Sequence, residues 1–362
     1  MKYLIATILS IVFILTPILM KVALKYNFTD KPTKRKKHRG PIPLCGGISM
    51  FIGFFIPYFI VFYDHPFKEK YGIFIGALLI LIIGVVDDYY KSIGKEFAII
   101  PRLIVQLLAA IIVYKSGVVF QGFTNPFTNT YVVLPTIIQF ILTITWIFGV
   151  TTVINWSDGM DGLAGGLSFI SAMTFAASAV ILSQPPSLLF SLMIAGVVLA
   201  FLFYNKYPAR IFMGDSGANF LGFILSIIAL DGAFKAATIL SLLIPILALA
   251  VPIFDNIFVI FKRFSEGKPI YQADRSQLHY RLEAKGKTME VGIKFGEYIG
   301  MYIQGEFLED GEFEVDSVFP YVKPMSYEKY KNGQDSLFFE APVLLLISSD
   351  MPIDGALAAS NI

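Results

Sequence analysis

Two long apolar runs, at residues 131–154 and 163–183, flank the stretch NWSDGMDGLAGG at residues 155–166. This stretch holds two carboxylates, Asp158 and Asp161, together with a carboxamide and four glycines. An ionised carboxylate near the centre of a bilayer costs about 2.5 to 3.5 kcal/mol on insertion scales, so acids kept close to a membrane are candidate functional groups. The stretch therefore predicts a functional site at the end of a membrane helix, where the helix meets water.

The composition is that of an integral membrane protein. The chain has 362 residues, of which 56% are hydrophobic and 15% charged, and its mean hydropathy is +0.67. The first apolar run is too long for a signal peptide and no small-residue cleavage site follows it, so we expect a retained first helix. The single cysteine, Cys45, excludes an intrachain disulfide and a multi-cysteine metal site, and we expect it to serve as a small apolar packing residue.

Apolar runs long enough to cross a hydrocarbon core of ~30 Å, at 1.5 Å per helical residue, recur along the chain. We predict an all-α polytopic membrane protein with about nine transmembrane helices. The nine runs are residues 3–23, 44–63, 71–86, 98–114, 131–154, 163–183, 187–204, 217–231 and 236–261.

Lysine and arginine are concentrated in the loops of one side. Cytoplasmic loops carry the excess of these residues, so that side should be cytoplasmic and the N-terminus should lie outside. Four polar clusters lie on the same predicted side and can form one site with cytoplasmic catalytic loops. These clusters are residues 87–88, 155–161, 205–215 and 274–281.

Asp87 and Asp88 end the third apolar run. Adjacent residues of a helix point about 100° apart, so the two acids cannot chelate one ion as equivalent ligands. One acid can face the reaction while the other faces a metal, a lysine or a helix N-terminus. A pair of solvated acids at a helix end is the alternative interpretation.

Asp158 and Asp161 share one face if their segment opens a helix. The surrounding glycines allow close backbone approach and leave amides free to bind an anion. Carboxylates and phosphate in one place imply a divalent cation, and Mg²⁺ typically takes one or two carboxylates plus substrate phosphate oxygens. A glycine-rich helix break with caps is the alternative.

Asp215 lies among glycines where the eighth run begins, close in sequence to Lys206 and Arg210, which suit phosphate. Its alternative role is an N-cap, since Asp is a preferred capping residue. The last cluster, residues 274–281, adds two guanidiniums, whose geometry matches phosphate, and the imidazole of His279. That imidazole could equally be an ordinary surface group.

The chain changes character after about residue 285. Residues 286–362 hold 13 acidic and 5 basic residues, a net charge of −8, and no run that could span a membrane. The apolar segment 341–349 is too short to cross a bilayer and is better explained as a buried strand. We expect an integral membrane domain at residues 1–285 and an acidic, soluble-type cytoplasmic tail at residues 286–362.

Taken together, these stretches resemble the polyprenyl-phosphate N-acetylhexosamine-1-phosphate transferase family of bacterial envelope synthesis. The resemblance covers roughly residues 1–285 and is strongest to the branch that primes enterobacterial common antigen, O-antigen and wall teichoic acid. The first loop, RGPIPLCGG at residues 39–47, favours that branch over the related muramoyl-pentapeptide transferases. The matching stretches are residues 31–47, 87–88, 155–166, 212–217 and 274–282.

The resemblance implies a Mg²⁺-dependent exchange, with Mn²⁺ as the alternative ion. The phosphate of undecaprenyl phosphate would attack the β-phosphorus of UDP-N-acetylglucosamine, the UDP-N-acetylhexosamine donor expected for this branch, and release UMP. Because the lipid cannot leave the bilayer, the enzyme would work in the inner (plasma) membrane. The resemblance implies no nucleic-acid partner, and it is compatible with a homodimer.

The resemblance also assigns roles to residues. Asp87 would be the base that keeps the lipid phosphate ionised, and Asp215 would hold the metal with support from Asp88. The expected catalytic acids are Asp87, Asp88, Asp158 and Asp161, and the expected substrate-binding residues are Asn155, Lys206, Arg210, Arg275, His279 and Arg281.

Two departures from the family pattern matter. Gln277 and Tyr280 stand where the last motif usually carries histidines, so a role that needs a second imidazolium would be lost. The family continues after this motif with further membrane helices, whereas the tail looks like a fusion or a truncated fragment. Residues 335–362 faintly resemble an internal piece of the nitroreductase flavoprotein fold but lack most of what a flavin site needs, so we expect no flavin.

Two other classes of function stay open at this point. A transporter or ion-binding protein could use the same acids, although transporter sites usually lie near the midplane between repeats and no repeat is evident in this sequence. A catalytically impaired, truncated relative of the transferases is the second alternative. The changed last motif and the unusual tail motivate it.

Overall fold

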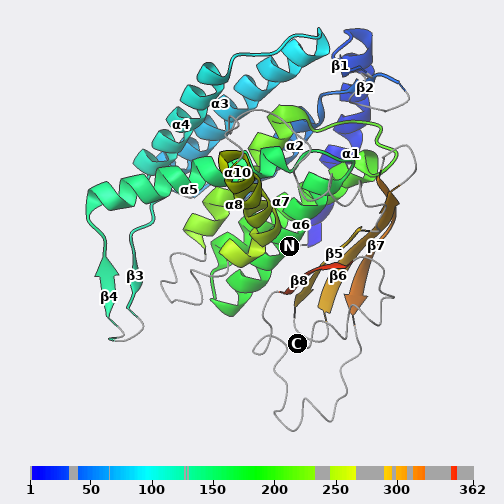
Figure 1. Cartoon of the computed structure of the whole chain (residues 1–362). Helices are drawn as coiled ribbons and strands as arrows, with labels where there is room; N and C mark the ends of the chain where they lie inside the picture. The colour runs from blue at the N-terminus through cyan, green and yellow to red at the C-terminus, as the bar shows by residue number, and fades with distance from the viewer. Residues whose placement is uncertain are drawn as a thin grey trace, which may run out of the picture. The chain divides into compact units, whose positions relative to one another are not determined.

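The computed structural model describes residues 2–31, 40–64, 66–125, 128, 130–232 and 245–265, and four strands between residues 289 and 348. The chain divides into two compact units, Met1–Ile246 and Leu247–Ile362. Figure 1 labels the helices and strands of each unit. The predicted domain boundary at residue 285 lies outside the described residues, and it stays a prediction.

The first unit is helical over most of its described length. Long runs of apolar residues form its helices. The helices end where these runs give way to polar or glycine-containing segments. The helices are α1 (Lys2–Lys25), α2 (Gly46–Val61), α3 (Phe67–Ser92), α4 (Ile99–Ser116), α5 (Thr136–Trp156), α6 (Leu163–Ile181), α7 (Pro185–Asn205) and α8 (Gly214–Asp231).

Among the described residues, six helices are long and apolar enough to span a membrane by their length and composition: α1, α3, α4, α5, α6 and α7. α2 is apolar but shorter, with 16 residues. The predicted class of a helical membrane protein is therefore confirmed, whereas the number of nine spans stays a prediction. The ninth predicted run, residues 236–261, begins in the segment 233–244, which lies outside the described residues.

A short hairpin joins α4 to α5. Its strands β3 (Gly122–Thr124) and β4 (Tyr131–Val133) pair antiparallel. The helix predicted to begin at residue 131 therefore begins later, at Thr136, with Pro135 before it. Aromatic and β-branched residues favour the strand, and proline, which lacks an N–H, is tolerated where a helix starts.

The first loop packs on the residues that precede α8. Its strands β1 (Thr29–Asp30) and β2 (Ile42–Pro43) pair antiparallel. Phe212 N donates a hydrogen bond to Pro43 O at 2.9 Å, and Gly46 N donates one to Phe212 O at 3.1 Å. Cys45 is buried in this loop, and burial raises the pKa of its thiol to about 12, which agrees with the packing role expected for it.

α8 is buried along nearly its whole length and packs against α2, α3 and α5. Small residues let these helices approach closely, as is common in membrane helix packing. A Cβ added to Gly84 of α3 would overlap the backbone of Ser216, and one added to Gly222 of α8 would meet Thr151 Cα of α5 at 2.7 Å. These contacts fix α8 between its neighbours.

The second unit contains one helix and a sheet in its described residues. The helix is α10 (Ala250–Ser265). The strands β5 (Met289–Phe295), β6 (Ile299–Phe307), β7 (Phe313–Val322) and β8 (Leu344–Ser348) form an antiparallel sheet in the order β7-β6-β5-β8. The strand predicted at residues 341–349 corresponds to β8. The sheet is an addition to the helical class predicted for the chain.

The contact between α3 and α8 can be tested at Gly84. We expect Gly84→Ala to lower the free energy of unfolding by at least about 1–3 kcal/mol, because the added methyl group overlaps backbone atoms that cannot move aside. The measurement is the thermal unfolding midpoint of the purified protein in detergent. Gly149→Ala in α5 is the matched control, since a Cβ there meets nothing within 4 Å, and it should leave the midpoint unchanged or slightly raised. Equal midpoints for both variants would contradict the packing described for α3 and α8.

Candidate active site

The site is built around the N-terminus of α8, whose first N–H groups need acceptors from outside the helix. The residue that precedes the helix, Met213, makes no capping hydrogen bond with its side chain. The acceptor is instead Asp88 of α3. Its Oδ1 accepts from Asp215 N at 2.7 Å, and its Oδ2 accepts from Ser216 N at 3.1 Å and from Ser216 Oγ at 2.7 Å. A fully buried carboxylate thus joins the end of α3 to the start of α8.

Gly214 makes room for this contact. Its φ is +69°, a left-handed conformation that glycine adopts without steric cost. A Cβ on this residue would also overlap the carboxylate of Asp88. Only glycine therefore allows the chain to turn into α8 with the acid in place.

Asp87 points to a different group of side chains from Asp88. Its Oδ2 lies 3.2 Å from Lys91 Nζ and 3.2 Å from Arg102 Nη1, and the residue is 1% exposed. The divergence follows from the 100° rotation between adjacent helical residues. One acid therefore meets cations and the other a helix N-terminus, and a helix N-terminus is one of the partners expected for the acid that does not face the reaction.

Asp215 completes a cluster of four charges. Its Oδ1 lies 2.7 Å from Lys91 Nζ, and its Oδ2 lies 3.6 Å from Arg102 Nη1. Asn155, at the end of α5, donates from Nδ2 to the same Oδ1 at 3.3 Å. We call Asp87, Lys91, Arg102 and Asp215 the acid–cation cluster. It comes from three helices and carries no net charge.

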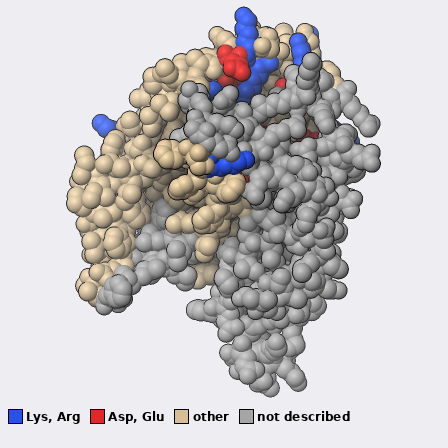
Figure 2. All heavy atoms as spheres, viewed as in Figure 1, with Lys and Arg blue, Asp and Glu red and all other residues tan. Residues whose placement is uncertain are grey.

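The acid–cation cluster is buried on one side and open on the other. Asp87 is enclosed, whereas the side chains of Asp215, Arg102 and Lys91 are 17%, 31% and 38% exposed. Figure 2 shows acidic and basic atoms together at the upper end of the view, the end at which α3 and α4 meet in Figure 1. A charged ligand from solvent can therefore reach the two cations.

The stretch 155–166 is joined to the loop before α8. Gly162 N donates to Asn205 Oδ1 at 3.1 Å, and Asn205 Nδ2 donates to Ile211 O at 2.9 Å. Asp161 Oδ2 accepts from Ala209 N at 2.8 Å. These bonds hold the two polar segments side by side.

The structure places the other predicted site residues as follows. Asp158 and Asp161 are half-buried in the segment between α5 and α6. Lys206 and Arg210 are exposed in the loop before α8, and Lys206 Nζ lies 5.8 Å from the ring centroid of Phe203. The residues Arg275, His279 and Arg281 lie outside the described residues.

Two members of the acid–cation cluster were missed as site residues by the sequence analysis. Lys91 follows Asp87 by four positions on one helix, a spacing that pairs side chains, so the signal was present. Arg102 is a charged residue at the start of the predicted membrane run 98–114, and such residues are functional candidates. One turn further on, Gln106 Nε2 donates to Asn219 Oδ1 at 3.2 Å and continues the polar contact between α4 and α8.

The donor set suits a hard divalent cation. No group of three or more His, Cys, Asp or Glu side chains that could hold a metal occurs in the part of the chain that the structure describes. Asp87 and Asp215, however, turn oxygens toward one shared cation, the Lys91 ammonium. Mg²⁺ needs only one or two carboxylates when substrate phosphates supply the remaining ligands. These two acids therefore fit the metal implied by the family resemblance.

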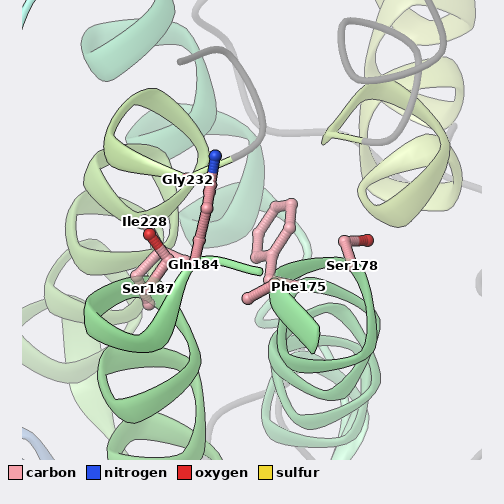
Figure 3. Close-up of a pocket in the computed structure, with 7 residues that line it drawn as sticks. Phe175, Ser178, Gln184, Ser187, Ile228 and Gly232 are labelled. Carbon is pink, nitrogen blue, oxygen red and sulfur yellow. The ribbon is translucent and has the colours of Figure 1, made fainter. Parts of the chain in front are cut away.

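A small pocket lies at the other end of α8. Phe175 and Ser178 of α6, Gln184 and Ser187 around the start of α7, and Gly232 line it (Figure 3). Gln184 Oε1 is buried there without a hydrogen-bond partner. The pocket is separated from the acid–cation cluster by the length of α8, so it is not part of this site.

Two comparisons with known proteins, one with a family model and one with individual relatives, point to the same family. Residues 71–233, which contain the whole acid–cation cluster, match Glycosyl transferase family 4. The chain is 37% identical over 282 residues to the probable undecaprenyl-phosphate N-acetylglucosaminyl 1-phosphate transferase of Bacillus subtilis (strain 168), with 78% of this chain and 77% of the relative covered.

Two enterobacterial relatives are also similar. The chain is 27% identical over 297 residues to the undecaprenyl-phosphate alpha-N-acetylglucosaminyl 1-phosphate transferase of Escherichia coli (strain K12), with 78% of both chains covered. It is 29% identical over 275 residues to the protein of the same name from Yersinia pestis, with 74% of this chain and 73% of the relative covered.

The capping role of Asp88 predicts a specific loss of stability. Asp88→Asn removes the charge and one acceptor oxygen, so we expect the free energy of unfolding to fall by about 1.5–3 kcal/mol. Thermal unfolding in detergent measures this change, and hydrogen exchange at the amides of Asp215 and Ser216 should become faster. Glu96→Gln, an exposed acid after α3, is the control and should change the stability by less than about 0.5 kcal/mol. Unchanged exchange at both amides would rule out the capping role.

Proposed function

Because the chain belongs to glycosyl transferase family 4, we propose that it transfers N-acetylglucosamine 1-phosphate from UDP-N-acetylglucosamine to undecaprenyl phosphate. The acid–cation cluster is the observation that carries the proposal. It joins one buried acid, Asp87, and one partly exposed acid, Asp215, to two more exposed cations at one end of a group of apolar helices. A lipid phosphate from the bilayer and a nucleotide from water can meet at such a place.

The proposed reaction exchanges one phosphorus–oxygen bond for another. A phosphate oxygen of the lipid forms a bond to the β-phosphorus of the UDP-sugar. The bond from that phosphorus to the oxygen shared with the α-phosphate breaks, and UMP leaves with the electron pair. Both reactants are anions, so positive groups must offset their repulsion in the transition state.

Each residue of the cluster has a part in this proposal. Asp87 and Asp215 would hold Mg²⁺, or Mn²⁺ in its place, and a bound ion would supply charge stabilisation at the phosphoryl oxygens. Asp87 would also keep the lipid phosphate ionised. Lys91 and Arg102 are close enough to the acid pair to attract and orient phosphate groups.

The neighbouring residues position the cluster. The Asp88 carboxylate supports the metal site by fixing the start of α8, on which Asp215 lies. The Asn155 amide orients the Asp215 carboxylate. We propose that the remaining predicted residues shape the nucleotide pocket or bind its phosphates and sugar, and these are Asp158, Asp161, Lys206, Arg210, Arg275, His279 and Arg281.

The membrane setting completes the proposal. We place the cluster on the cytoplasmic side of the inner membrane and the N-terminus outside, because the basic loops support that orientation. The product would initiate a cell-envelope polysaccharide such as teichoic acid, O-antigen or common antigen. A homodimer stays a prediction.

The function is tested by a transfer assay with labelled UDP-N-acetylglucosamine and undecaprenyl phosphate, using the full chain in detergent micelles. We expect Asp87→Asn and Asp215→Asn each to reduce transfer at least about 100-fold, because each removes a carboxylate that would hold the divalent cation, and with it the positive charge that would offset the repulsion between the two phosphates. Chelation of divalent ions with EDTA should stop the reaction, and added Mg²⁺ should restore it.

Glu96→Gln is the control for this assay, since Glu96 is exposed and lies outside the cluster. It should keep the activity of the unmodified protein. Full activity in either Asp87→Asn or Asp215→Asn would contradict the roles given to these acids, and absence of transfer by the unmodified protein would contradict the proposed function.

A further inference from the structure

The Lys91 ammonium lies where a cation bound by Asp87 and Asp215 would lie. Its Nζ is 3.2 Å from Asp87 Oδ2 and 2.7 Å from Asp215 Oδ1, so both acids direct an oxygen at the same nitrogen. Arg102 meets the same pair through Nη1 at 3.2 and 3.6 Å. The acid pair therefore already has two positive charges as partners.

These positive charges satisfy an electrostatic requirement. Asp87 is 1% exposed, and a buried carboxylate without a partner is strongly unfavourable. Two carboxylates side by side would also repel each other. A divalent cation would also carry two positive charges. It could therefore neutralise the two carboxylates in place of side-chain cations.

Lys91 is better placed than Arg102 to move away. It lies in the last turn of α3, which ends at Ser92, and its side chain is 38% exposed. Arg102 also donates from Nη2 to the Phe97 carbonyl oxygen at 3.5 Å, which gives its guanidinium a second attachment. A flexible, strongly hydrated ammonium is the easier of the two groups to return to water.

We propose that the Lys91 ammonium occupies the divalent-cation position between Asp87 and Asp215 and competes with the cation for it. Lys91 is thus a residue that sets the metal affinity of the site, distinct from the residues that hold the metal. The inference rests on the proposed function, because that function is what requires the divalent cation.

The test is equilibrium Mn²⁺ binding to the full chain in detergent, measured by the loss of the free-ion signal in electron paramagnetic resonance, without nucleotide or lipid substrate. We expect Lys91→Met to lower the Kd for Mn²⁺ at least about tenfold, which corresponds to about 1.4 kcal/mol. Lys91→Gln should do the same and replaces Lys91→Met if that variant does not fold. Lys91→Arg keeps the charge and should remain within about threefold of the unmodified protein.

Lys95→Met is the matched control, because it removes the same charge from an exposed lysine in the adjoining loop. It should leave the Kd within about twofold. Adding Asp215→Asn to Lys91→Met should abolish the gain if the ion binds at this pair. An unchanged Kd in Lys91→Met, an equal change in Lys95→Met, or a gain that survives Asp215→Asn would each overturn the proposal.

The transfer assay separates this inference from the proposed function. If the unmodified protein transfers the sugar phosphate but Lys91→Met binds Mn²⁺ no more tightly, Lys91 does not compete with the cation, and the proposed function is unaffected. If Mn²⁺ binding tightens as expected but no transfer occurs, the competition stands and the function is wrong.

Discussion

The site depends on one charge-assisted contact, between the Asp88 carboxylate and the N-terminus of α8. A helix start presents unpaired N–H groups and a partial positive charge, which water or a local side chain usually satisfies. At α8 the acceptor comes from another helix and is fully buried. If α3 and α8 moved apart, the carboxylate and the amides would lose their partners without gaining water, so the relative position of the helices is fixed. Asp215 is fixed with them, because its own N–H is one of the donors.

The adjacency of Asp87 and Asp88 places the acid that caps α8 beside a member of the acid–cation cluster. The same 100° rotation that turns Asp88 toward α8 turns Asp87 toward Lys91 and Arg102. The capping contact therefore also sets the separation between Asp87 and Asp215, although neither acid takes part in it through its carboxylate. Under the proposed function, a metal held by Asp87 and Asp215 would require few ligands from the protein, since the helices are held by other groups. Substrate phosphates can supply the remaining ligands.

The sequence was sufficient for the helical class, for the divergence of the two adjacent acids and for the place of Asp215 at the start of the eighth helix. Those inferences follow from periodicity, from hydropathy and from the cost of charges near a bilayer. The cap on α8 could not be predicted, because its donor and acceptor lie 127 residues apart and capping signatures are local. Arg102 lies inside the apolar run at residues 98–114, so hydropathy does not single it out. The hairpin at residues 122–133 was obscured by the apolar character of Tyr131, Val132 and Val133, which suits a strand as well as a helix.

The glycine-rich stretch at residues 155–166 contributes to the site largely through its backbone and amides. Gly162 has a φ of +72° and offers its N–H to Asn205, and Asp161 accepts from the loop that leads to α8. Asn155, at the end of α5, reaches Asp215 directly. The stretch therefore holds the start of α8 through hydrogen bonds separate from those of α3, and the Asp161 carboxylate takes part in this positioning. An acid such as Asp161 can therefore serve to position the start of α8, whether or not it also takes part in the chemistry.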